Sequence, residues 1–95
     1  MALTERNEND KIEVVGQYKT VQVRRATVIE RDGVELTRSF HRHVLQPGTV
    51  GVGTDQLTDT DISGEDADVQ AICNAAWTDA VKEAWRLKLV SDAAE

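Results

Sequence analysis

The sequence predicts a small α+β domain, in which an antiparallel β-hairpin or meander packs against one long C-terminal α-helix. Three observations predict this class. A chain of 95 residues has room for one small core. Apolar and polar residues alternate over residues 18–45, on both sides of the turn signal Asp32-Gly33. Residues 65–89 then carry apolar side chains at helical spacing.

The start of the chain is polar. Residues 1–10 contain 3 acids and 2 asparagines, a composition typical of a flexible N-terminal arm. We therefore expect residues 11–95 to form the single domain. A short apolar run from Ile12 to Val15 ends at Gly16 and indicates a brief strand or a bulge.

The turn at Asp32-Gly33 sets the register of the hairpin. A two-residue loop would place Glu30 directly opposite Glu35, and facing like charges are unfavourable. A three-residue loop over residues 31–33, with Gly33 left-handed in a bulge, places Val28 opposite Leu36 instead. The sequence therefore favours the bulged turn, and it predicts one apolar face on the second strand, made by Val34, Leu36, Phe40 and Val44.

A polar connector over residues 54–64 leads into the expected helix. Ser63 and Asp66 have the spacing of a capping box, which places the helix start near residue 65 and its end near 89. The apolar residues of this segment cover a wider arc than one packing surface needs. A stripe within the arc either caps the core beside the hairpin or faces another subunit; it consists of Trp77, Val81 and Trp85.

The net charge of -6 is unevenly distributed along the chain. Residues 55–95 hold 10 acids and 3 Lys+Arg, whereas residues 19–43 hold 6 Lys+Arg and 3 acids. Three arginines of the hairpin are candidates for contacts between proteins, namely Arg24, Arg38 and Arg42. We expect them to pair with the acids of residues 55–68, within one chain or between copies.

Composition disfavours several classes of protein. An acidic chain without a pair of stacked aromatic residues argues against nucleic-acid binding. No stretch approaches the length of a membrane span, and the start has no apolar segment of a secretory signal, so we expect no membrane partner. The single Cys73 excludes a disulfide framework, and no cofactor motif is present.

Two short motifs have part of the pattern of a metal site. His41 and His43 point to one face of a strand and could supply two ligands, but the sequence offers no third. Asp59, Asp61 and Ser63 match the start of a calcium loop, yet Gln70 stands where a bidentate glutamate is required. We therefore predict no metal, and we predict no enzyme because no nucleophile or paired-carboxylate motif appears.

Four short strings give the chain a resemblance to a known group. They are Lys11-Ile-Glu-Val-Val, Ser39-Phe-His-Arg-His-Val-Leu, and Asp61-Ile-Ser-Gly-Glu-Asp together with Trp77-Thr-Asp-Ala-Val-Lys. Over residues 11–89 the chain resembles small, mostly uncharacterised proteins of marine tailed bacteriophages. The resemblance implies an origin in a phage genome, where small acidic proteins of this kind are often virion components or assembly accessories.

Together these features predict a non-enzymatic structural or interaction protein, a capsid or tail accessory subunit of a virion. Such a subunit would contact other virion proteins or copies of itself as an oligomer or part of a larger assembly. It would be found in the virion, and in the host cytoplasm during assembly. The first alternative is a small phage regulator that binds a host protein or nucleic acid. A minor metal-binding module is the other.

Overall fold

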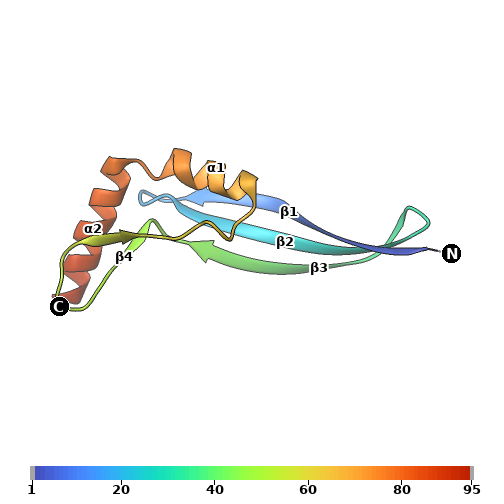
Figure 1. Ribbon diagram of the computed structural model, residues 1–95, viewed down its shortest axis with the longest axis horizontal. Helices are drawn as coiled ribbons and strands as arrows, with labels where there is room; N and C mark the ends of the chain where they lie inside the picture. Colours follow the sequence, from blue (N-terminus) through green and yellow to red (C-terminus); the bar gives the residue numbers. More distant parts are fainter. Residues whose placement is uncertain (1, 95) are drawn as a thin grey trace.

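The computed structural model describes residues 2–94; Met1 and Glu95 lie outside the described residues. It confirms an α+β fold built on an antiparallel three-stranded sheet with strand order β1-β2-β3 (Figure 1). A small sheet of β4 and β5 and two helices follow. The elements are β1 Leu3–Val15, β2 Thr20–Arg31, β3 Val34–Leu45, β4 Gly48–Val50, β5 Leu57–Asp59, α1 Ala67–Ala76 and α2 Asp79–Ala93.

The polar start of the chain is part of the sheet. Residues 3–10, for which the sequence predicts a flexible arm, form the first part of β1 and pair with β2 from Leu3 opposite Arg31 onward. The register shifts between Asn9 and Lys11, so Asp10 forms a bulge. The segment is a paired strand whose side chains are largely exposed, which explains its polar composition. A flexible arm has the same polar composition, so composition alone does not distinguish an exposed strand from a flexible arm.

The hairpin is confirmed, but the predicted register of its turn is wrong. Asp32 and Gly33 have φ angles of 51° and 82° and form the two-residue loop that left-handed residues favour. Glu30 therefore does face Glu35. The bulge lies in β3 at Leu36, the residue after Glu35, and not in the turn itself. The like charges are tolerated because each glutamate has its own arginine partner, described below.

The C-terminal segment is two helices, not one. The helix breaks at Trp77, where ψ is 73°, and Thr78 caps α2 by accepting a hydrogen bond of 3.2 Å from the Val81 amide. The break lets the Trp77 indole N–H donate to the Lys19 carbonyl in the β1–β2 turn, at 2.8 Å. After the break, α2 contacts β4 rather than continuing along the sheet.

The predicted capping box is also wrong. Asp66 is the N-cap residue of α1 and makes no side-chain cap hydrogen bond, while Ser63 donates its amide to Asp61 at 2.9 Å in a turn upstream. The Asp66 carboxylate instead accepts from the Asn9 side chain of β1, at 2.8 Å. Tertiary contact with β1 therefore replaces the local cap.

The core lies at one end of a long molecule. Val21 and Val23 of β2 pack against Val69 and Cys73 of α1 and against Trp77. The chain measures 59 × 24 × 22 Å and has a radius of gyration of 17.5 Å, whereas a compact chain of this length has about 12 Å. Figure 1 shows why: the strands run well past α1 toward the hairpin turn. We call this projecting part, residues 3–8, 26–31 and 34–40, the sheet arm.

Candidate interaction surface on the open sheet face

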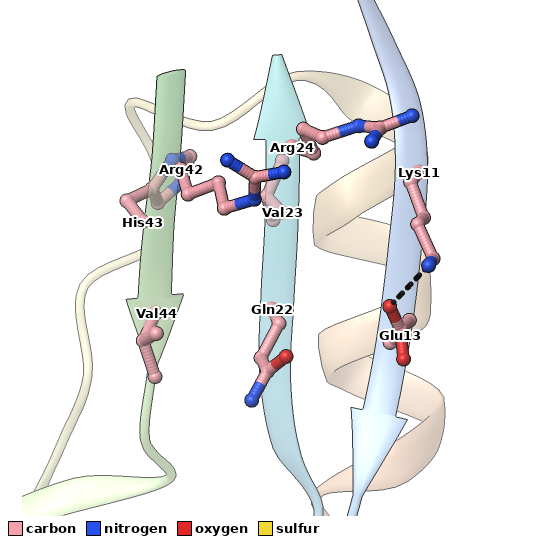
Figure 2. Close-up of a pocket in the computed structure, with 8 residues that line it drawn as sticks. All are labelled: Lys11, Glu13, Gln22, Val23, Arg24, Arg42, His43 and Val44. Atoms are coloured by element: carbon pink, nitrogen blue, oxygen red, sulfur yellow. Dashed lines mark ion pairs between the residues drawn. The ribbon is translucent and has the colours of Figure 1, made fainter. Parts of the chain in front are cut away.

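One face of the sheet is left without a covering helix. Val21 and Val23 point toward α1, so the residues between and after them in β2, Gln22 and Arg24, point the other way. Figure 2 shows Gln22, Arg24 and Arg42 in front of the strands, with the helix behind the sheet. We call this side the open face. It carries a shallow groove of about 250 Å³ that spans all three strands.

A row of three basic residues crosses the open face at the groove. Lys11 of β1 faces Arg24 of β2, and Arg24 faces Arg42 of β3. Like charges in facing positions destabilise a sheet, so each needs a counter-charge. Lys11 has Glu13 at 3.0 Å (Figure 2). Arg24 reaches over β1 to the Asp10 carboxylate with two hydrogen bonds of 2.9 and 2.8 Å.

Arg42 differs from its two neighbours. Its side chain extends from β3 over β2, beside Gln22 and Arg24 (Figure 2). No ion pair or hydrogen bond joins it to another side chain among residues 2–94, and it is exposed. Arg42 is therefore a cation at the groove to which no residue of 2–94 offers a counter-charge.

Apolar side chains border this cation. Phe40 and Val44 lie two residues before and after Arg42 on β3, on the same face, and are 46% and 55% exposed. The Arg24 guanidinium covers one side of the Phe40 ring, 4.4 Å from its centre. A charged group flanked by exposed apolar groups is typical of a protein-binding surface.

The predicted single apolar face of β3 is interrupted. The bulge at Leu36 reverses the alternation, and Val34, paired with Arg31, lies on the face opposite Phe40 and Val44. All four residues of that prediction are exposed. None of these four residues belongs to the buried core.

The sheet arm carries a network of ion pairs on the open face. Arg38 contacts Glu35 at 2.9 Å, Glu8 at 3.0 Å and Asp10 at 3.8 Å, and Arg6 contacts Glu30. The hydrogen bond from Arg24 lowers the pKa of the Asp10 carboxyl, and the one from Arg38 lowers the pKa of Glu35. These contacts stabilise the arm where it has no helix to pack against.

The predicted partners of the arginines are thus wrong within the chain. Arg24 and Arg38 pair with acids of β1 and with Glu35 of β3, not with those of residues 55–68. The later acids have other contacts: Asp59 pairs with Lys82 at 3.2 Å. The sequence prediction did not include Arg6, Glu8 and Asp10. Their spacing could have indicated them, since charges at every second position are typical of the polar face of a strand.

The tryptophan stripe packs inside the chain. Trp77 is 7% exposed and belongs to the core. The Trp85 indole N–H donates to the Gly48 carbonyl at 2.8 Å, and its ring lies 5.3 Å from that of Tyr18. Val81 packs against the core cluster. Of the two readings of this stripe, the one that caps the core agrees with these contacts.

The candidate metal ligands contact other groups of the chain and do not gather at one point. His43 contacts Glu65 at 2.9 Å, and His41 is exposed on β3. Asp59 pairs with Lys82, and the Asp61 carboxylate accepts from Ser63, which lowers the pKa of Asp61. Within residues 2–94, no three His, Cys, Asp or Glu side chains come together in a group that could hold a metal ion.

Comparison with models of protein families, with curated proteins and with solved structures finds no match to this chain. Among the helices of residues 2–94, none combines the length and the hydropathy that crossing a membrane requires.

Proposed function

We propose that the chain is a non-enzymatic structural protein of a bacteriophage virion, an accessory subunit of the capsid or tail that acts through protein–protein contacts. The open face is its contact surface. The phage assignment rests on the resemblance of residues 11–89 to small phage proteins, and the contact role rests on the shape and surface of the molecule.

The exposed surface of the chain supports the contact role. It amounts to 6349 Å², whereas a compact protein of 10.5 kDa exposes about 5,400 Å². The excess is close to the roughly 800 Å² that one partner loses in an interface of standard size. A chain of this shape can bury its excess surface by binding another protein.

The observation that carries the proposal is Arg42, which has no ion-pair or hydrogen-bond partner within residues 2–94 and lies between two exposed apolar side chains. A partner carboxylate placed over the groove would meet Arg42 directly and would keep clear of Arg24, which Asp10 already holds. Phe40 and Val44 supply apolar area on either side. Acidic residues are abundant in the second half of this chain itself, so copies of the chain and other acidic proteins both fit.

Mass spectrometry of purified phage particles tests the proposal. Peptides of this chain are expected in the particle fraction, and Arg42→Glu is expected to lower their amount about tenfold, because one charge pair at a desolvated interface is worth about 1.4 kcal/mol or more. The matched control is Arg25→Glu, since Arg25 is the exposed neighbour on β2 that points to the opposite face.

Two outcomes would overturn the proposal. A protein that stays a monodisperse monomer at high concentration and is absent from particles is no virion subunit. Equal losses in Arg42→Glu and Arg25→Glu would remove the open face as the contact surface. Thermal unfolding of both variants checks that each still folds.

A further inference from the structure

We propose that β3 pairs with β3 of a second copy, antiparallel and about a two-fold axis, so that two three-stranded sheets become one continuous sheet. The inference rests on the proposed contact role and names the partner. Its residues are those of the β3 edge between Thr37 and Leu45.

The β3 edge is the sheet edge best suited to a new strand. The strand order β1-β2-β3 leaves one side of β3 free, and no other strand among residues 2–94 pairs with it. An unpaired edge presents a row of backbone donors and acceptors to solvent. From Thr37 to Leu45 every residue pairs with β2 in unbroken register, and the segment contains no proline. This is a regular template nine residues long.

The other edge is protected against such pairing. β1 carries the bulge at Asp10 near its middle, and a bulge twists an edge away from an incoming strand. Pairing of β3 with β1 of the next copy would also propagate without closing, which produces fibres. Pairing of β3 with itself closes after two copies.

The charges select one register. A two-fold axis perpendicular to the sheet keeps both open faces on one side, so even-numbered residues must face even-numbered ones. With the axis at His41, the centre of the regular segment, Arg42 faces the Phe40 ring of the second copy. A shift of one step in either direction would place Arg42 opposite Arg38 or opposite Arg42 of the second copy, which like-charge repulsion disfavours.

A cysteine on the proposed axis tests the register. In His41→Cys, the two cysteines of a pair would face each other across an antiparallel ladder, with Cα atoms about 4.5–5.5 Å apart, which lies within the range that a disulfide spans. Mild oxidation at micromolar concentration is expected to convert most of this variant into a disulfide-linked dimer on a non-reducing gel.

Two controls separate specific pairing from random collision. Thr37→Cys places a thiol at another exposed position of the same strand, but it would face Leu45 of the second copy, so little dimer is expected. The wild-type chain retains only Cys73, which is buried and whose thiol pKa is raised by that burial, and it should stay uncrosslinked. Light scattering of the wild type is expected to give twice the chain mass of 10.5 kDa.

The outcomes distinguish this proposal from the proposed function. A monomeric wild type, or equal cross-linking of the two cysteine variants, would overturn the β3 pairing. If the chain is nevertheless found in particles, the virion role stands without it. Conversely, a cross-linked His41→Cys dimer in a protein absent from particles would support the pairing and overturn the virion role.

Discussion

At the scale of single residues, ion pairs with arginines explain how the sheet arm accommodates two facing glutamates. Glu30 and Glu35 face each other across the hairpin, an arrangement that local rules count as unfavourable. Arg6 pairs with Glu30, and Arg38 pairs with Glu35. Val28 lies between these two arginines in the register and is completely buried, because their aliphatic stems flank it on both sides.

The same network makes stability depend on pH. The folded-state pKa values of Asp10 and Glu35 are lowered by their arginine partners. Carboxyls of this kind stabilise the fold above their unfolded pKa values near 4, and this stabilisation is lost as pH falls through the folded values. The urea midpoint of the wild type is expected to fall between pH 6 and pH 3.

The variant Arg38→Gln should flatten this pH profile, because it removes the guanidinium that Glu35, Glu8 and Asp10 share. Its midpoint should lie below that of the wild type at pH 7 and converge with it at pH 3. The matched control is Arg25→Gln on the opposite face, which should keep the wild-type profile. Parallel profiles for Arg38→Gln and the wild type would contradict a stabilising role of the network.

At the scale of elements, the break between α1 and α2 is the main departure from expectation. The apolar spacing continues through residues 65–89, so periodicity predicts one helix. The structure interrupts it at Trp77, and each tryptophan then reaches a different carbonyl, that of Lys19 or that of Gly48. No local rule indicates this break, because both carbonyls lie more than 35 residues away along the chain.

Thr78 fixes the start of α2 through its side-chain hydrogen bond to the Val81 amide. Thr78→Ala is expected to lower the free energy of unfolding by about 1 kcal/mol, the usual effect of losing an N-cap. Thr78→Ser retains the hydroxyl and should restore most of the loss. Chemical denaturation of the three proteins measures the difference, and equal stability of the alanine and serine variants would show that the cap contributes nothing.

At the scale of the whole molecule, the core occupies one end and the sheet arm extends from it. The helices cover Val21 and Val23, while the arm depends on backbone pairing and on ion pairs. Local stability should therefore differ along a single strand. β1 shows the contrast most directly, since Ile12 packs against the core cluster and residues 3–8 do not.

Amide hydrogen exchange of the dilute protein should report this gradient. Amides of β1 within residues 3–8 are expected to exchange at least tenfold faster than those near Ile12, corresponding to about 1.4 kcal/mol or more of local opening free energy. Concentrating the protein should slow exchange in β3 and leave β1 unchanged. Uniform exchange along β1 would show that the arm and the core unfold as one unit.

The sequence by itself determined the α+β class, the hairpin with its turn at Asp32-Gly33, and the helical character of the C-terminal segment. These features follow from turn chemistry and periodicity, which act between near neighbours. Only the tertiary structure decided that residues 3–10 are a strand, that the helix breaks at Trp77, and that Lys11 and Arg24 of the basic row find counter-charges in β1 whereas Arg42 finds none in the described part of the chain. Each of these outcomes depends on contacts between distant segments, and such contacts form only once the strands and helices are brought together.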